Sequence, residues 1–594
     1  CILCGLCVRI CERMGNSALG LTGRGVEMRV DTPFHIQSDV CMGCGACAFV
    51  CPTGHIKLED ITKKAVQPIP SEYDMGLKGR KPIYVPYAQA IPNMPAIDRS
   101  RCLHFKTGGC QICAEFCGVN AIDYNQQDEI IELNVGAIVL ATGFQPFDPS
   151  KFENYNYANH PNVITSMEFE RILSATGPTM GHVVRLSDHK EPKKIAWLQC
   201  IGSRELNRCD NFYCSTICCM YAAKQAVIAK EHTGYSLDST IFYMDMCTPR
   251  KDFEKYYAAS KEKYGVRFIR SHVHTVNPVS GTDDLEVRYI SDDGTIKTEV
   301  FDMVVLSVGM EISSEIVDFA NRIGIELTDG NFCKTDKENP IATQRKGIYV
   351  CGAFQGPKDI PESVMEASAA ACSAGIKLAS ARGTLVKKRE FPVENDVADQ
   401  APRIGVFVCN CGINIGGIVD VPALALYAKG LPNVVYVEEN LFTCSQDTQD
   451  KMVEVIREEK LNRIVVAACS PITHEPLFQE TLQNAGLNAY LFDMANIRNQ
   501  CTWVHSSDRK NALEKCKDLV KMAVARASLL EPIPDISVDV NPSALIIGGG
   551  IAGMQAALDA ADSGYYVYLI ERSTSIGGVM SQLDKTFPTN DCAM

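Results

Sequence analysis

The amino-acid sequence predicts an α/β protein whose parallel sheets follow small, cysteine-rich α+β modules. Twelve cysteines fall within the first 117 of its 594 residues. Residues 403–530 alternate strand-like apolar runs with helix-patterned segments, which is typical of a parallel sheet. Residues 543–571 follow the order strand, glycine-rich turn, helix and strand. Together these observations predict the order of the modules along the chain.

The first two cysteine ladders have the spacing of a two-cluster ferredoxin. Each reads C-x2-C-x2-C-x3-C, and Pro52 follows the second ladder. In such runs three thiolates hold one 4Fe–4S cubane, and the fourth cysteine ligates the neighbouring cluster. Zinc, the alternative, prefers two separated C-x2-C pairs. The crossed pattern assigns one cluster to Cys1, Cys4, Cys7 and Cys51, and the other to Cys41, Cys44, Cys47 and Cys11.

A third ladder follows after the first two. Its first member, Cys102, is separated by seven residues from Cys110, Cys113 and Cys117, which keep the spacing C-x2-C-x3-C. This pattern predicts one further cubane, with a zinc knuckle as the alternative.

The last segment carries a complete dinucleotide-binding fingerprint. Gly548, Gly550 and Gly553 lie between a predicted strand at 543–547 and a predicted helix at 554–563, and Glu571 ends the next strand. The first glycine makes the tight turn, the second lets the backbone approach a pyrophosphate, and the third allows close helix packing. The acid is placed to bind the ribose hydroxyls. Gly578, in Ile-Gly-Gly beyond the acid, indicates FAD over NAD by resemblance to flavoprotein reductases.

Composition predicts a reduced, multidomain protein of the cytoplasm. The 28 cysteines cluster in metal-binding spacing, and the sequence shows no signal peptide ahead of them. No apolar run approaches the roughly 18 residues that a membrane span needs. A net charge of −13 argues against a nucleic-acid-binding surface. Because the sequence begins at a cluster ligand and stops inside a nucleotide-binding fold, we expect it to be an excerpt of a longer protein.

Two upstream segments resemble the FAD domain of the glutathione and thioredoxin reductase class. Residues 136–143, which include Thr142 and Gly143, resemble the strand-turn that passes the FAD pyrophosphate. Residues 347–371, which include Gly352, resemble the closing motif where a helix N-terminus meets the flavin. In those reductases both segments follow the glycine fingerprint, whereas here they precede it. A tandem duplication explains this order most simply, and two halves that share one flavin are the alternative.

The middle domain lacks the second glycine fingerprint that such reductases use for NAD(P)H. Cys200 stands at the end of its first strand, and Cys214, Cys218 and Cys219 follow in the run YCSTICCMYAAKQA. Four thiols in place of a phosphate cradle predict a metal cluster at the nicotinamide position. Buried structural thiols are the alternative interpretation.

The segments CIGSR, YCSTICCMYAAKQA, GAFQGPKDIP, VFVCNCGINIGG and LDKTFPTNDC together resemble the A subunit of heterodisulfide reductase and its bacterial relatives. Residues 1–60 instead resemble the two-cluster domain of iron-only hydrogenases and of the large electron-input subunit of complex I. The resemblance implies an atypical cubane held by Cys200, Cys214, Cys218 and Cys219, with Cys209 as a spare thiol. It also implies partners: other subunits of a heterodisulfide-reductase-like complex, a ferredoxin or a hydrogenase- or formate-dehydrogenase-type protein, and a second copy of the chain within a larger assembly.

Pattern and resemblance together divide the chain into eight predicted parts. They are a two-cluster ferredoxin-like domain (1–62), a linker with the third cluster module (63–130), a first FAD-domain part (131–192), an inserted cluster-bearing middle domain (193–300), the C-terminal FAD-domain part (301–385), a linker (386–402), a parallel α/β domain that opens a second copy (403–535), and the truncated Rossmann-type, FAD-binding start of that copy (536–594).

The α/β domain has cysteines at one edge of its predicted sheet. Cys409, Cys444 and Cys469 lie at or just past the carboxyl ends of predicted strands, where parallel sheets place ligands, and Cys501 follows the next strand. This placement predicts a further cluster bound by these four residues, with buried core thiols as the alternative. The remaining cysteines show no spacing and are predicted to be core residues: Cys247, Cys333, Cys351, Cys372 and Cys516.

Lys358, in GPKDIP beside the expected isoalloxazine, is the predicted tuning residue of the flavin. We expect it to stabilise the anionic flavin or to bond to N5 at a helix terminus that already favours negative charge. A surface lysine is the alternative.

These features predict a flavin-based, electron-bifurcating or confurcating oxidoreductase subunit of anaerobic metabolism, which passes electrons between FAD and 4Fe–4S clusters. The alternatives are an NAD(P)H-linked FAD oxidoreductase and a passive wiring subunit. The former needs a second glycine fingerprint, and we find none in the sequence.

Overall fold

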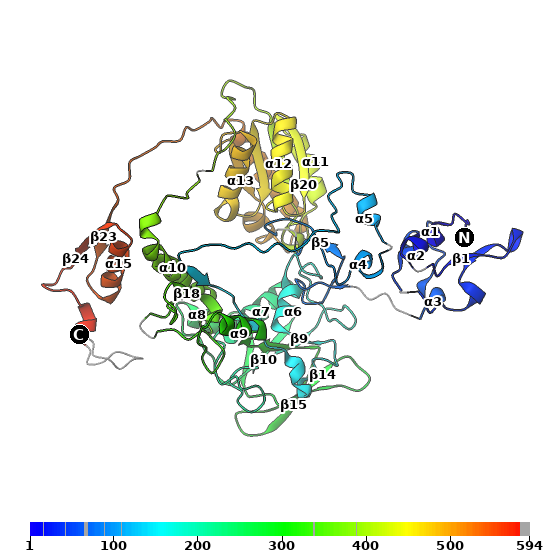
Figure 1. The fold of residues 1–594 in the computed structure, drawn as a ribbon, viewed down its shortest axis with the longest axis horizontal. Coiled ribbons are helices and arrows are strands. Elements are labelled where there is room, and N and C mark those ends of the chain that lie inside the picture. Colours follow the sequence, from blue (N-terminus) through cyan, green and yellow to red (C-terminus); the bar gives the residue numbers. More distant parts are fainter. Residues whose placement is uncertain are drawn as a thin grey trace.

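The computed structural model describes residues 1–582 apart from residues 16, 42, 64–68, 88–89, 109, 337–338 and 388. Within them the chain forms a small N-terminal module, a central body, a separate α/β domain and a C-terminal βαβ segment (Figure 1). The predicted class, α/β with small cysteine-rich modules, is confirmed by the parallel sheets. Among the described residues no helix is long and apolar enough to cross a membrane.

The N-terminal module contains two short helices that each follow a cysteine loop. Helices α1 (Leu6–Arg13) and α2 (Ala46–Phe49) begin after glycines in the left-handed region, Gly5 at φ 68° and Gly45 at φ 73°. Glycine adopts this conformation without steric cost, so each C-x2-C loop turns directly into its helix. The other elements are β1 (Gly20–Thr22), β2 (Arg29–Asp31) and α3 (Leu58–Ile61).

Residues 69–130 form an extended module between the N-terminal module and the central body. Arg13 of α1 binds Glu115 of this module at 2.5 Å, and Arg171 of the central body binds Asp74 at 3.0 Å. These two ion pairs tie the module to both neighbours. Its elements are β3 (Ile69–Pro70), β4 (Gly79–Arg80), β5 (Ile83–Tyr84), β6 (Ala96–Ile97), α4 (Leu103–Thr107) and α5 (Ile112–Glu115).

The central body is organised around a five-stranded parallel sheet in the order β12-β11-β10-β16-β9. The middle strand is buried along nearly its whole length, which explains its continuous apolar run. The strands are β9 (Val163–Thr165), β10 (Lys194–Ile201), β11 (Asp238–Tyr243), β12 (Arg267–Arg270) and β16 (Met303–Val308). The helices are α6 (Ser166–Leu173), α7 (Cys218–His232) and α8 (Phe253–Glu262), and an antiparallel sheet contains β13 (Thr275–Pro278), β14 (Leu285–Ile290) and β15 (Ile296–Phe301).

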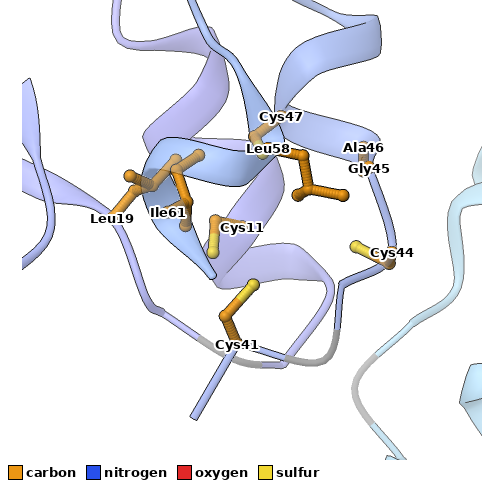
Figure 2. A pocket seen from close by; sticks show the side chains of 9 residues that line it. All are labelled: Cys11, Leu19, Cys41, Cys44, Gly45, Ala46, Cys47, Leu58 and Ile61. Atoms are coloured by element: carbon orange, nitrogen blue, oxygen red, sulfur yellow. The ribbon is translucent and has the colours of Figure 1, made fainter. Parts of the chain in front are cut away.

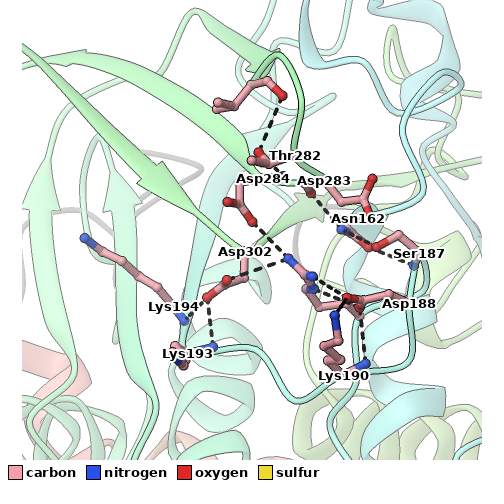
Figure 3. A network of polar contacts seen from close by, with 12 residues as sticks. Asn162, Ser187, Asp188, Lys190, Lys193, Lys194, Thr282, Asp283, Asp284 and Asp302 are labelled. Atoms are coloured by element: carbon pink, nitrogen blue, oxygen red, sulfur yellow. Dashed lines mark hydrogen bonds and ion pairs between the residues drawn. The ribbon is translucent and has the colours of Figure 1, made fainter.

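The sheet of the middle domain extends beyond the predicted range 193–300. It includes β9 and β16, which lie in the two ranges predicted for the FAD domain. Because β9 has only three residues, no periodicity marks it in the sequence. Arg185 joins the flanking loops through Asp188, Asp284 and Asp302 at 2.5, 2.9 and 3.8 Å. Figure 3 shows these three aspartates in one network of polar contacts.

The two upstream FAD-like segments lie side by side. Strand β7 (Ile138–Leu140) pairs in parallel with β18 (Ile348–Val350), although the whole middle domain separates them in the sequence. Nearby, β8 (Gln145–Pro146) pairs with β17 (Met310–Glu311). Helix α9 (Ser314–Arg322) shares an apolar core with β7 and β18. Helix α10 (Ile360–Lys377) begins after Asp359, whose carboxylate caps the helix by accepting a hydrogen bond from the Glu362 amide.

The α/β domain contains a four-stranded, all-parallel sheet in the order β20-β19-β21-β22. Each predicted strand is present, and central strands β19 and β21 are buried on both faces. The preceding linker packs on this domain, because the Asn395 amide donates to the Gly486 carbonyl at 2.8 Å. The elements are β19 (Ile404–Cys409), α11 (Val421–Lys429), β20 (Val434–Asn440), α12 (Gln446–Glu458), β21 (Arg463–Ala468), α13 (Pro471–Ala485), β22 (Phe492–Asn496) and α14 (Arg509–Ala527).

The C-terminal segment is a single βαβ unit. It contains β23 (Ser543–Ile547), α15 (Ile551–Asp562) and β24 (Tyr566–Ile570), with the two strands parallel. Helix α15 contacts α10, and the Arg382 guanidinium lies 4.7 Å from the Tyr565 ring centroid. The motif LDKTFPTNDC lies outside the described residues.

Candidate functional site

The first two ladders meet in two thiol-lined pockets. Figure 2 shows the sulfur atoms of Cys11, Cys41 and Cys44 directed toward a common space among apolar side chains. The structure groups the ladders in the crossed manner. One pocket is lined by Cys11, Cys41, Cys44 and Cys47, and the other by Cys1, Cys4, Cys7 and Cys51.

Backbone amides point at some of these sulfur atoms. The Ala18 amide donates to Cys11 Sγ at 3.2 Å, and the Gly43 amide donates to Cys41 Sγ at 3.4 Å. Burial raises the pKa of Cys47 to about 11, so a metal must displace a proton to bind this thiol. Apolar pockets with four sulfur atoms and amide donors fit a 4Fe–4S cubane. No set of three or more His, Cys, Asp or Glu side chains in the described part of the chain is arranged to hold a single metal ion.

Three thiols of the third ladder lie near an aromatic pair. The Tyr124 hydroxyl lies 2.7 Å from Cys113 Sγ, and the His104 ring stacks on Tyr124 at 3.8 Å. His104 Nδ1 donates to the Cys110 carbonyl at 3.0 Å. Burial and the neighbouring Cys113, Cys102 and Cys110 thiols raise the pKa of Tyr124. The fourth member, Cys117, accepts from the Ala121 amide at 3.2 Å.

The middle-domain thiols gather at the carboxyl edge of the parallel sheet. Cys200 is the second-last residue of β10, and Cys218 and Cys219 begin α7, where the helix dipole favours a thiolate. Burial raises the pKa of Cys200 to about 11, and the Cys214 thiol contributes to this shift. Cys209 lies apart and donates to the Glu205 carbonyl.

A further thiol, Cys247, joins this set, although the sequence predicts it as a core residue. Burial raises its pKa, and the neighbouring Cys214 thiol contributes to this shift. The Thr216 amide donates to Cys214 Sγ at 3.4 Å, while the buried Thr216 hydroxyl has no hydrogen-bond partner in the described structure. An orphaned hydroxyl among five thiols fits a sulfur-rich cluster that accepts hydrogen bonds.

In the α/β domain the gathered thiols differ from the predicted set. Cys409, Cys444 and Cys469 lie at one edge as expected, but the fourth thiol is Cys411. Cys501 points away, because its thiol donates to the Ala512 carbonyl at 3.1 Å and accepts from Cys516 at 3.4 Å. The structure therefore does not bring Cys501 to the other three predicted ligands. Its π-helix, Arg498–Thr502, turns Cys501 into the core.

Arg498 is the cation of this site. A hydrogen bond from Cys409 and the charge of Arg498 together lower the pKa of Cys411 to about 6. Arg498 also acts on Cys444 and Cys469, whose pKa values are raised chiefly by burial. An arginine beside three of the four thiols partly compensates the negative charge of an all-cysteine metal site.

The glycine fingerprint has the geometry of a pyrophosphate turn. A Cβ on Gly553 would lie 1.8 Å from the Gly548 carbonyl oxygen, so close strand–helix packing requires glycine there. At Gly550 a Cβ would meet no atom within 4 Å, which leaves room for a ligand. The Glu571 carboxylate accepts from the Gly549 amide at 2.7 Å, and hydrogen bonds from Ser573 and Gly549 lower its pKa to about 2. This loop fits a dinucleotide.

Lys358 is buried at the start of α10. Its Nζ lies 3.0 Å from Glu366 Oε2 and donates to Gln355 Oε1 at 2.6 Å and to the Gly352 carbonyl at 3.0 Å. Glu366 also accepts from the Gly352 amide at 3.0 Å. Lys358 is therefore no surface residue. It forms an ion pair with Glu366 within the second FAD-like segment, which contains Gly352. In the first FAD-like segment, Thr142 and Gly143 follow strand β7, which pairs with β18 of the second.

Three family models match parts of the chain. Residues 1–55 match a 4Fe-4S dicluster domain, residues 118–371 a pyridine nucleotide-disulphide oxidoreductase, and residues 544–590 an FAD dependent oxidoreductase. The cofactors are therefore FAD and 4Fe–4S clusters. Among solved structures, LpdA from Mycobacterium tuberculosis is 16% identical with a TM-score of 0.26, over 43% of this chain and 44% of that one.

Curated relatives carry a common name, that of the A subunit of a heterodisulfide reductase. The iron–sulfur A subunit of CoB–CoM heterodisulfide reductase from Methanocaldococcus jannaschii is 39% identical over 351 residues, and the second such protein of Methanopyrus kandleri is 42% identical over 355 residues. The A subunit of the H2/formate:CoB-CoM heterodisulfide,ferredoxin reductase from Methanococcus maripaludis is 37% identical over 352 residues.

These alignments cover 58–59% of this chain, and the chain spans about half the length of the relatives, 50% of each. The comparisons confirm the resemblance to the A subunit of heterodisulfide reductase, and they make this chain an iron–sulfur flavoprotein of the oxidoreductase class.

Proposed function

We propose that this chain is the flavin-bearing electron-transfer part of a heterodisulfide-reductase-like complex, and that its flavin is a branch point that splits or merges electron pairs. A flavin exchanges one or two electrons, whereas iron–sulfur clusters carry single electrons. The observation that carries the proposal is the thiol site at the sheet edge of the middle domain. It occupies the position at which an NAD(P)H-dependent reductase binds nicotinamide.

The local structure at that edge supports this assignment over an NAD(P)H-linked oxidoreductase. A pyrophosphate site needs a tight glycine turn from strand to helix. Here a long loop, 202–217, separates β10 from α7, and the helix begins with two cysteines. A Cβ on Gly202 would lie 2.1 Å from the Phe147 ring, so this glycine serves packing. The helix N-terminus is thus available to thiolates and not to a phosphate.

In this proposal five sets of cysteines hold clusters. The first four sets are those predicted from spacing and resemblance, and the fifth replaces Cys501 by Cys411. The sets are Cys1, Cys4, Cys7 and Cys51; Cys41, Cys44, Cys47 and Cys11; Cys102, Cys110, Cys113 and Cys117; Cys200, Cys214, Cys218 and Cys219; and Cys409, Cys411, Cys444 and Cys469.

Contacts between the modules support a continuous path for electrons. The Arg13–Glu115 pair joins α1, the helix of the first ladder, to the third ladder. The Arg171–Asp74 pair joins the module that carries the third ladder to α6. Just past α6, Ala175 touches Gly412, which is adjacent to Cys411. The α/β-domain site therefore lies at a contact with the central body.

The protein supplies binding and electrostatics for the flavin. Gly550 and Glu571 would bind the pyrophosphate and ribose, and Gly143 and Gly352 would line the same cofactor from the other segments. Lys358 would stabilise the reduced, anionic flavin, with Glu366 limiting the net charge. The contact of α15 with α10 favours one flavin shared by both halves of the chain over a separate second copy.

Partners follow from the same proposal. The name of the Methanococcus maripaludis relative includes H2, formate and ferredoxin. We propose that this chain acts in the cytoplasm within a multisubunit complex, exchanges electrons with a ferredoxin or a hydrogenase- or formate-dehydrogenase-type protein, and pairs with a second copy of itself.

Metal analysis of the anaerobically purified chain tests the proposal. Iron and acid-labile sulfide should approach about four of each per cluster, and FAD should be present. Reduced ferredoxin should bleach the flavin, and the double variant Cys200→Ala/Cys214→Ala should slow that bleaching while FAD remains bound. Zinc in place of iron at the ladders, or a flavin that ferredoxin does not reduce, would contradict the proposal.

A further inference from the structure

The loop at residues 244–252, between β11 and α8, contacts both the middle-domain thiol site and the first turn of α10. We propose that Arg250, near the end of this loop, is a positioning residue that fixes the thiol site relative to the flavin. The inference rests on the proposed function, which assigns a cluster to the thiols and places the flavin beside α10. It concerns a residue that neither the cysteine spacing nor the resemblance selects.

The beginning of the loop lies against the thiol site. Cys219 Sγ lies 3.6 Å from the Asp245 carbonyl oxygen. The Asp245 carboxylate pairs with Arg204 at 3.0 Å and with Arg270 at 3.4 Å. Arg204 lies on the loop after β10, and Arg270 ends β12. Because β10 and β12 are the two neighbours of β11 in the sheet, Asp245 ties the loop to both sides of its own strand.

The end of the loop is bound to the first turn of α10. The Arg250 guanidinium forms ion pairs with Glu362 and with Asp359, whose Oδ2 lies 3.5 Å from Arg250 Nε. The other carboxylate oxygen, Asp359 Oδ1, accepts from the Glu362 amide at 2.9 Å and caps the helix. Arg250 therefore binds the residue at which α10 starts and the acidic residue of its first turn.

The contact between the loop and the helix is partly buried. The Arg250 and Asp359 side chains are 30% and 12% exposed. Within the described structure, Arg250 Nε and Asp359 Oδ2 have no hydrogen-bond partner, so each relies on the ion pair for compensation. Moving the loop away from the helix would leave a partly buried charge without its counterpart on both sides. The ion pair thus favours one position of the loop on α10.

Arg250 therefore connects the two proposed redox sites over a short length of chain. Because a chain extends by at most about 3.6 Å per residue, the Cα atoms of Asp245 and Arg250 lie within about 18 Å of each other. One turn beyond Glu362, Glu366 pairs with Lys358, the residue proposed to stabilise the reduced flavin. Electron transfer slows steeply as two cofactors move apart, so a loop held at both ends keeps their separation short and constant.

Hydrogen exchange in the full chain tests the contact itself and requires no bound cofactor. In Arg250→Met the amides of residues 362–366 should exchange about tenfold faster, because the start of α10 loses its partner on the loop. Arg250→Lys should restore most of the protection. Lys255→Met is the matched control: it removes an exposed ion pair with Asp252, 2.7 Å long, from the same domain, and should leave this exchange unchanged.

The rate of flavin reduction by reduced ferredoxin tests the consequence. Arg250→Met and Glu362→Gln remove the same ion pair from its two sides, and they change the charge near the flavin in opposite directions. If Arg250 positions the two sites, both variants should bleach several-fold more slowly than the unmodified chain with their FAD still bound. Their flavin potentials, measured by spectroelectrochemical titration, should shift in opposite directions.

Two results would overturn the inference. Unchanged exchange of residues 362–366 in Arg250→Met would show that the loop does not hold the helix. Slower bleaching in Arg250→Met together with faster bleaching in Glu362→Gln would show that Arg250 acts only through its charge. An unmodified chain whose flavin ferredoxin does not reduce would contradict the proposed function, and with it the role of Arg250 between the two sites.

Discussion

Tyr124 provides the clearest side-chain hydrogen bond to a candidate cluster ligand. Its hydroxyl lies 2.7 Å from Cys113 Sγ. A donor to a thiolate stabilises the reduced cluster, so Tyr124→Phe should lower the potential of the third cluster. A hydrogen bond to a charged group contributes about 1.5–3 kcal/mol, and partial exposure reduces this to a shift of tens of millivolts. An EPR-monitored redox titration measures it, with Tyr87→Phe as the control, and an unchanged potential would exclude this role.

Cys411 and Cys501 form a matched pair of residues for the site in the α/β domain. Cys411→Ser should remove about four iron atoms per chain, because its thiol completes the set around Arg498. Cys501→Ser should leave the iron content unchanged, because Cys501 faces Cys516. Iron analysis after anaerobic purification compares them. The reverse result would restore the ligand set predicted from the sequence.

Lys358 and Glu366 should shift the flavin potential in opposite directions. Lys358→Met removes a cation that stabilises the anionic flavin, so the two-electron potential should fall by tens of millivolts. Glu366→Gln removes the opposing charge and should raise it. The two charges lie 3.0 Å apart. Spectroelectrochemical titration gives both values, and equal potentials in all three proteins would mean that the pair has only a structural role.

At the scale of elements, the glycine turn before α15 decides whether the C-terminal βαβ unit holds the flavin. A Cβ on Gly550 meets no protein atom, so Gly550→Ala should fold normally yet block the pyrophosphate. The affinity for FAD, measured by titration of the flavin fluorescence, should fall by about tenfold or more. Gly375→Ala, an equally open position in α10, is the control. If Gly550→Ala retains its FAD, residues 136–143 and 347–371 bind the flavin without this unit.

Local spacing predicted the elements and sites that depend on near neighbours in the sequence. The four strands of the α/β domain and the crossed grouping of the first two ladders both follow from patterns within a few residues. Cys247 escaped prediction because only the pairing of β10 with β11 brings it to Cys200. The direction of Cys501 could not be predicted, because it is set by a π-helix, which has no sequence signature.

At the scale of the whole molecule, the central body resembles a reductase in architecture but not in the chemistry of its second nucleotide site. The body contains a five-stranded parallel sheet, and cysteines begin the helix that follows its middle strand. The modules before this body contain the three cysteine ladders, and the α/β domain after it contains a further group of four thiols. This arrangement is what a flavin needs in order to exchange single electrons with several carriers.

Flavin reduction by NADH, compared with reduction by ferredoxin in the same anaerobic preparation, tests the central claim most directly. We expect reduced ferredoxin to bleach the FAD absorbance fully. NADH should neither bind tightly nor bleach it, because residues 199–204 provide no glycine turn for its pyrophosphate. Stoichiometric bleaching by NADH in the isolated chain would contradict the claim and identify an NAD(P)H-linked oxidoreductase.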